Sequence, residues 1–141
     1  MKTFRKIKPY LIFPLGMIAI TLMSLSEAMQ QRSPWIAPAG ADTIKNPLKG
    51  NVTAIEAGKK VYAMYCVVCH GEKGKGNGVA ASNLNPRPAD HSSERVQKQT
   101  DGALYWKLSA GRPPMASYAK TLTTQQRWQV VDYIRTLKAE K

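Results

Sequence analysis

Apolar and polar positions divide the 141-residue chain into three parts. A basic N-terminus is followed by residues 9–26, which are largely apolar and carry no charge. Residues 29–52 contain three prolines and two glycines and show no apolar period. From residue 53 to residue 141, apolar side chains recur at the spacing of helices, and no stretch alternates as a strand does. The pattern predicts an N-terminal segment over 1–28, a linker or strap over 29–52 and an all-α domain over 53–141.

The first helix of this domain is predicted to begin at Thr53. Glu56 then stands at the third helical position, where it and Thr53 form a reciprocal capping box. The helix continues as far as Cys66. Its predicted apolar face consists of Ile55, Val61, Tyr62 and Tyr65.

Two further helices follow. Asp101 is expected to cap the short helix GALYWKLSA, which Gly111 ends. Thr123 is expected to cap the last helix, with Gln126 as its capping-box partner. The apolar face of this last helix consists of Trp128, Val130, Val131, Tyr133, Ile134 and Leu137. Loops rich in glycine and proline join the helices, so the core is marginal and needs a disulfide, a metal or a bound group to stabilise it.

The N-terminal segment is typical of an export signal or a membrane anchor. Its basic cluster precedes residues 9–26, which as a helix would span roughly 27 Å, just short of a bilayer core. Ser26 and Ala28 place small residues where a signal peptidase cleaves. Cleavage and retention both remain open. In either case the residues after 28 are expected in a bacterial periplasm, soluble or anchored to the outer face of the cytoplasmic membrane.

Trp35 is the large aromatic residue of the strap. It is expected to pin the strap to the domain or to a membrane interface.

The net charge of +12 indicates an acidic partner protein or an anionic membrane surface. No dense run of lysine and arginine is interleaved with aromatic residues, so nucleic acid is not expected as a partner.

The two cysteines of the chain lie in the motif CVVCH, residues 66–70. A thioredoxin-like redox pair would begin a helix after a strand, whereas this pair ends a helical stretch. A structural zinc site would need Cys66, Cys69, His70 and His91 together, but Cys69 and His70 are adjacent and zinc ligands usually lie two to five residues apart. A disulfide between the two cysteines would close almost no loop and stabilise little.

Covalent attachment of haem suits the motif best. Its two thiols add to the vinyl groups of a haem, and the adjacent imidazole binds the iron from one face. Cys66, Cys69 and His70 lie at i, i+3 and i+4, so they share one side of a helical turn. One haem c would also supply the missing core, and export fits its attachment outside the cytoplasm.

The sixth ligand of the iron is predicted to be Met115. Four of the six methionines lie in or beside the N-terminal segment, and Met64 belongs to the attachment turn. Met115 follows Pro113 and Pro114, which fix the approach of its loop. His91 is the competitor, but it lies in the polar run ADHSSER and is expected to be exposed.

These features resemble the class I c-type cytochromes over residues 53–141. The resemblance rests on CVVCHG, the glycine-rich loop, the proline segment, the methionine loop and the terminal helix ending YIRTL. It implies that the first and last helices cross through a glycine and aromatics, which Gly58, Tyr62, Trp128 and Tyr133 match in kind. It also implies that a proline carbonyl, of Pro86 or Pro88, orients His70. The sequence departs from many relatives in having Ala116 directly after the methionine.

Three functions follow from this interpretation. The first is a one-electron carrier with His70 and Met115 on the iron, whose exposed haem edge is ringed by basic side chains that steer acidic redox partners. The second is a haem enzyme or gas sensor with an exchangeable sixth ligand. The third is a subunit that relays electrons inside a membrane-bound respiratory complex. In the carrier, the basic side chains expected to ring the haem edge are Lys73, Lys75, Lys107, Arg112 and Lys120.

Overall fold

The computed structural model describes residues 34–138, and within them the fold is all-α, as predicted. Their strand-like pairing is confined to an isolated bridge between Arg112 and Met115. The elements are η2 (Ala39–Thr43), α2 (Val52–Tyr65), α3 (Val67–His70), η3 (Ala81–Asn83), α4 (Glu94–Gln97), α5 (Asp101–Ala110) and α6 (Thr124–Thr136).

The predicted export signal or anchor, residues 1–28, lies outside the described residues. In the part of the chain that the structure describes, no helix is both long enough and apolar enough to cross a membrane. The boundaries of the three predicted parts therefore stay a prediction.

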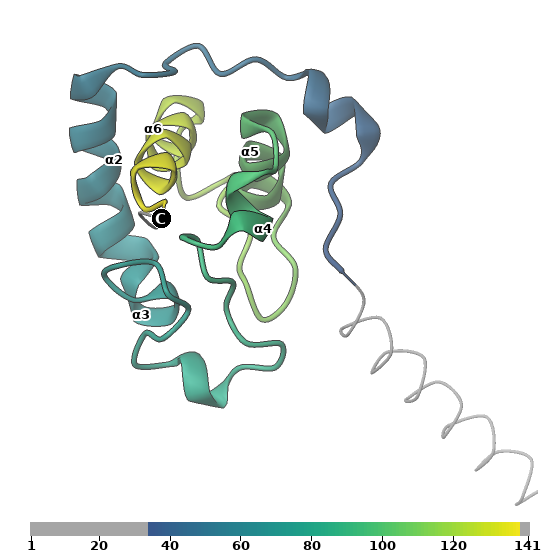
Figure 1. Cartoon of the computed structure of the whole chain (residues 1–141), viewed down its shortest axis with the longest axis vertical. Coiled ribbons are helices and arrows are strands. Elements are labelled where there is room, and N and C mark those ends of the chain that lie inside the picture. Colours follow the sequence, from purple (N-terminus) through teal and green to yellow (C-terminus); the bar gives the residue numbers. More distant parts are fainter. Residues whose placement is uncertain (1–33, 139–141) are drawn as a thin grey trace, which may run out of the picture. The chain divides into compact units, whose positions relative to one another are not determined.

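Helices α2 and α6 pack closely against each other, and α6 lies between α2 and α5 (Figure 1). They meet at Gly58, where an added Cβ would lie 1.9 Å from the carbonyl oxygen of Gln129. One turn further along, the rings of Tyr62 and Tyr133 pack edge to face, with centroids 5.1 Å apart. The predicted crossing through a glycine and aromatic residues is confirmed for these three positions.

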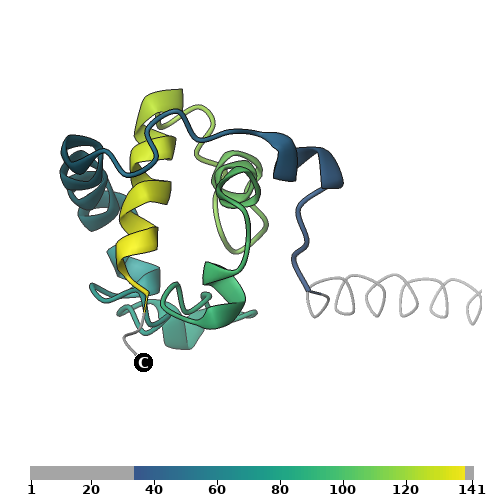
Figure 2. The same ribbon diagram turned by 45° about the horizontal axis from the view of Figure 1, so that its top comes forward.

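Helix α5 covers another side of α6 (Figure 2). Trp128 of α6 faces α5 and stacks on Tyr105 at 4.1 Å between ring centroids. The buried core shared by these helices consists of Tyr62, Cys66, Val96, Leu104, Leu108, Trp128, Val130, Val131 and Ile134.

The sequence located the starts of α2, α5 and α6 within two residues, whereas the four-residue helices α3 and α4 were not predicted. The capping box of Thr123 and Gln126 is confirmed. The predicted cap at Thr53 is wrong, because α2 begins at Val52 and the Asn51 side chain accepts from the Ala54 amide. Asparagine is at least as good a cap as threonine, so the earlier start is favoured.

The predicted cap of α5 is also displaced by one residue. The hydroxyl of Thr100 accepts from the Ala103 amide and caps the helix. Asp101 is instead the first helical residue, and its carboxylate pairs with Arg135 of α6 at 2.7 Å. The C-terminal end at Gly111 is confirmed, with φ of +66°.

Within the strap, residues 35–51 pass over α5 on the way to α2 (Figure 1). Gly102 of α5 allows this close approach, since a Cβ there would lie 2.0 Å from the carbonyl oxygen of Ala41. The carboxylate of Asp42 accepts from the Thr100 hydroxyl at 2.6 Å. The strap is therefore packed against the helical core over these residues.

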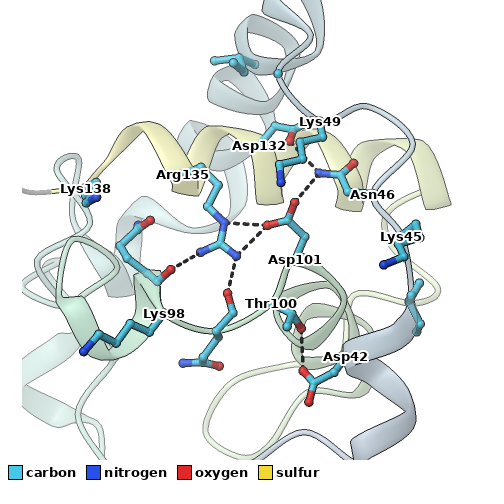
Figure 3. A pocket seen from close by; sticks show the side chains of 15 residues that line it. Asp42, Lys45, Asn46, Lys49, Lys98, Thr100, Asp101, Asp132, Arg135 and Lys138 are labelled. Atoms are coloured by element: carbon cyan, nitrogen blue, oxygen red, sulfur yellow. Dashed lines mark hydrogen bonds and ion pairs between the residues drawn. The ribbon is translucent and has the colours of Figure 1, made fainter.

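A groove of about 800 Å³ lies where the strap, α5 and α6 meet (Figure 3). Asn46 of the strap donates from Nδ2 to Asp132 at 2.7 Å and to Asp101 at 3.2 Å. Arg135 donates from Nε to Asp101 at 2.7 Å and from Nη1 to the carbonyl oxygen of Gln97 at 2.9 Å. This polar network joins the strap to both helices.

Candidate functional site

The motif CVVCH begins at Cys66, which joins α2 to α3, and its last four residues form α3. The Cys66 carbonyl accepts from the amides of Cys69 at 3.2 Å and His70 at 2.8 Å. This bonding places the two thiols and the imidazole along one turn, as their spacing predicted. Cys66 is buried and Cys69 is half-buried, and both thiols are free.

His70 is buried, and one ring nitrogen is already held. Its Nδ1 lies 2.9 Å from the carbonyl oxygen of Ala89, so Nδ1 carries the proton and donates it. In the neutral ring Nε2 is then unprotonated, and an unprotonated imidazole nitrogen is the atom that binds a metal.

The residue that orients His70 is Ala89, and the prediction of Pro86 or Pro88 is wrong. The Pro88 carbonyl faces Gly76 instead, where an added Cβ would lie 2.4 Å from the oxygen. The Gly76 amide donates to the His70 carbonyl at 2.8 Å. Gly76 therefore lets the proline segment approach until the next carbonyl, that of Ala89, reaches the imidazole.

Burial also fixes the protonation states at this turn. It lowers the pKa of His70, with the Ala89 hydrogen bond opposing the shift, so the imidazole is neutral near neutral pH. Burial together with the neighbouring Cys69 raises the pKa of the Cys66 thiol to about 12. A thioredoxin-like redox cysteine needs a lowered pKa, so this environment argues against that alternative.

His91 packs against His70, and the prediction that it is exposed is wrong. The two imidazoles stack with ring centroids 4.0 Å apart and an interplanar angle of 18°. His91 Nδ1 lies 3.1 Å from the hydroxyl of Tyr62. Burial and the nearby His70 lower the pKa of His91 to about 3, so this ring is also neutral. The polar neighbours of His91 in the sequence concealed its inward position.

Met115 lies in a tight turn that begins directly after α5. Its amide donates to the Arg112 carbonyl at 2.8 Å, and the Arg112 amide donates back to the Met115 carbonyl at 3.0 Å. The side chain is half-buried and packs against the core cluster. Met64, in contrast, is 74% exposed on α2, which agrees with its rejection as a ligand.

The turn of Met115 is tied to the cysteine turn through Tyr118. Its hydroxyl donates to the Tyr65 carbonyl at 3.1 Å, one residue before Cys66. The rings of the two tyrosines also pack edge to face, with centroids 6.2 Å apart. The methionine loop and the attachment turn are thus neighbours in the fold.

The residues of the turn fit the predicted haem. They offer two free thiols and a neutral imidazole whose Nδ1 is held by Ala89. A zinc site does not fit, because no group of three or more His, Cys, Asp or Glu side chains among residues 34–138 is arranged to hold a metal ion.

The five side chains of the predicted basic ring differ in their surroundings. Lys107 and Arg112 face the ring of Trp35, at 5.6 Å and 5.2 Å from its centroid. Lys75 donates to the Ser92 hydroxyl at 2.6 Å. Lys73 and Lys120 are exposed. Trp35 thus contacts the domain, which is one of its two predicted roles.

Comparison with known proteins agrees with this site. The cytochrome c family model matches residues 55–138, which is more than half of the chain. A comparison with curated proteins found no similar sequence.

Several solved structures are similar to the chain. One belongs to the reducing HAO-like protein complex Kustc0457/Kustc0458 of Kuenenia stuttgartiensis, at 28% identity and a TM-score of 0.60. That match covers 80% of this chain and 55% of the other, so this chain spans about half the length of that relative. Another is the c-type cytochrome KustC0563, at 25% identity and a TM-score of 0.51, over 58% of this chain and 98% of the other.

The family match, residues 55–138, includes the CVVCH turn and the methionine loop. Membership of this family implies a covalently bound haem c. The chain therefore belongs to the cytochrome c family and is a c-type cytochrome.

Proposed function

We propose that this protein is an exported one-electron carrier in which His70 and Met115 are the two axial ligands of a single haem c. Electron transfer by haem is the general function of its family. The observation that carries the finer proposal is the buried, neutral His70, whose Nδ1 is held by Ala89 at 2.9 Å beside two free thiols.

Each residue of the turn has a separate task. Cys66 and Cys69 would hold the haem through thioether bonds, which fix it to the end of α2. Ala89 holds the His70 ring in one orientation and tautomer, and this second contact raises the basicity of the opposite nitrogen. When bound, the haem iron supplies one-electron redox chemistry.

Met115 is proposed as the second ligand because its loop is rigid and adjacent to the attachment turn. Tyr118 connects that loop to Tyr65 at 3.1 Å, and the two-way bridge between Arg112 and Met115 closes the turn. A thioether held by such a loop loses little entropy on binding iron. Two permanent ligands leave the iron coordination unchanged between oxidation states, which favours fast electron transfer.

An apolar surface beside the cysteine turn is proposed as the docking site for redox partners. Val68 is 49% exposed and Val79 is 88% exposed, and both line a hollow of about 390 Å³. Lys73 and Lys75 line the same hollow together with Glu72, so its charged side chains are net positive. An acidic partner is therefore favoured, with association rates that fall as salt rises.

Membership of a larger redox complex is the second candidate. It is favoured by the similarity to a chain of a reducing HAO-like complex over 80% of the present chain. In that case the haem would relay electrons between fixed neighbours, attached to the membrane if residues 1–28 are retained. A periplasmic location rests on the predicted export segment.

The first experiment is the optical spectrum of the mature holoprotein, ferric and ferrous, with and without carbon monoxide. A ferric sulfur-to-iron charge-transfer band and no response to carbon monoxide are expected. Met115→Ala should remove the band and admit carbon monoxide. Met64→Ala is the matched control and should keep the wild-type spectrum, since that side chain is exposed on α2.

Prompt binding of carbon monoxide by the wild type, without the charge-transfer band, would overturn His/Met ligation. The alternative of a haem enzyme or gas sensor with an exchangeable ligand would then replace the carrier.

A further inference from the structure

Trp35 of the strap contacts the residue that begins the methionine turn. The guanidinium carbon of Arg112 lies 5.2 Å from the centre of the Trp35 ring. Through its backbone, the same Arg112 makes both hydrogen bonds of the bridge to Met115. One residue thus carries a side-chain contact to the strap and a backbone contact to the proposed ligand.

Two further contacts fix the Trp35 ring itself. Trp106 of α5 packs against it edge to face, with centroids 6.4 Å apart and an interplanar angle of 63°. Lys107 of α5 places its ammonium 5.6 Å from the ring centre. Trp35 therefore bridges the C-terminal half of α5 and the first residue of the turn that follows α5.

The ring also relieves a repulsion between two cations. Arg112 lowers the pKa of Lys107 because the two positive charges are close, although burial is the larger cause. The faces of an indole ring are electron-rich and attract both cations, more strongly than those of any other side chain. Without Trp35, the two like charges would lose the ring that attracts both, which should weaken the hold on the Arg112 end of the turn.

The strap is held at other points by contacts that do not involve Trp35. The hydroxyl of Thr100 donates to Asp42, and Gly102 admits the backbone at Ala41. Loss of the Trp35 ring should consequently leave the strap on α5 and loosen only the Arg112–Met115 turn, because the loop after it still bonds to the carbonyls of Leu108 and Ser109.

We infer that Trp35 is a positioning residue, which holds the Arg112–Met115 turn against α5 and so keeps the proposed thioether ligand in place. The inference rests on the proposed ligation by Met115. The strap would then influence the position of the Met115 thioether, because Arg112 contacts Trp35 through its side chain and Met115 through its backbone.

The test compares Trp35→Leu and Trp35→Phe with the wild-type holoprotein. Ile36→Ala is the matched control, because Ile36 is the next residue of the strap and is 79% exposed. Amide hydrogen exchange is measured at Met115, whose amide bonds to Arg112, and at Val131 in the core of α6. Exchange at Met115 reports opening of the turn whether or not the sulfur binds iron.

Trp35→Leu should raise exchange at Met115 about tenfold, the change expected for losing two cation–ring contacts, and should leave Val131 protected. The ferrous Trp35→Leu protein should also begin to bind carbon monoxide, to which the wild type is expected to give no response. Trp35→Phe keeps an aromatic face and should give a smaller change. Ile36→Ala should match the wild type.

Three results would overturn the inference. Exchange at Met115 that is unchanged in Trp35→Leu would show that the turn is held without the ring. Equal loss of protection at Met115 and Val131 would show general destabilisation and no local positioning. A wild type without the charge-transfer band would remove Met115 ligation itself, and with it the inference; in the first two cases the ligation would stand.

Discussion

Gly58 sets the distance between the two helices that carry the fold. A methyl group at this position would lie 1.9 Å from the Gln129 carbonyl oxygen and 2.4 Å from its carbon, far inside contact distance. These are backbone atoms of α6, so they yield only if the helices separate. The crossing therefore depends on a single missing side chain.

Gly58→Ala should destabilise the holoprotein by about 1–3 kcal/mol, the usual cost of overpacking, despite the better helix propensity of alanine. Denaturant unfolding measures the change. Gly40→Ala is the control, since nothing lies within 4 Å of a Cβ there. Equal stability of the two variants would mean that α2 and α6 tolerate a wider spacing.

At the residue scale, the sequence predicted residues that chemistry restricts and missed those that geometry selects. Cys66, Cys69 and His70 follow from the spacing of one motif. Ala89 could not be predicted, because any residue can supply a backbone carbonyl and the choice depends on how closely Gly76 admits the preceding segment. His91 was misplaced because its polar neighbours suggested an exposed loop.

At the scale of elements, the three longer helices α2, α5 and α6 were predictable, and their first residues were less so. The four-residue helices α3 and α4 were not predicted. The cap at Thr123 was predicted correctly because Gln126, at the third helical position, completes the capping box. At the start of α2 two caps compete, and Asn51 is used in place of Thr53. Polar residues adjacent to a helix start are similar in capping strength, so tertiary contacts decide between them.

Thr123→Ala tests the capping box of α6. The hydroxyl accepts from the Gln126 amide at 3.1 Å, and the Gln126 side chain accepts from the Thr123 amide at 2.9 Å. The substitution should lower the free energy of unfolding by about 1 kcal/mol, because one amide of the first turn loses its acceptor. Thermal and denaturant unfolding should both show it, whereas Thr121→Ala, at an exposed neighbouring position, should change neither. A loss as large in Thr121→Ala would assign the effect to the loop and not to the cap.

At the scale of the whole molecule, the strap is the part that the sequence described least. Its prolines and glycines predicted irregular chain, and Trp35 suggested a point of attachment. The groove network was not foreseen, because Asn46, Asp101 and Asp132 are far apart in the sequence and none belongs to an apolar pattern. Polar contacts between distant segments leave no periodic signal.

Asp132 within this network makes the stability of the fold depend on pH. Its side chain is buried at 3% exposure, and its Oδ2 has no hydrogen-bond partner among the described residues. Burial raises the pKa of this carboxyl, an effect that the hydrogen bond from Asn46 opposes. A carboxyl with a raised pKa in the folded state favours folding when protonated. That contribution is complete below its unfolded pKa of 3.8 and is lost as pH rises through the folded value.

Asp132→Asn removes this titration while keeping Oδ1 as an acceptor for Asn46. Relative to the wild type, the variant should therefore become more stable, with a larger free energy of unfolding, as pH rises from 4 to 7. Denaturant unfolding of both proteins across that interval measures the difference. Asp42→Asn is the matched control, because it makes the same substitution at an exposed strap residue that lines the same groove. If the Asp132→Asn variant instead lost stability relative to the wild type as pH rose, the ionised carboxylate would be a net stabiliser of the strap, and a cation from the groove would have to reach its second oxygen.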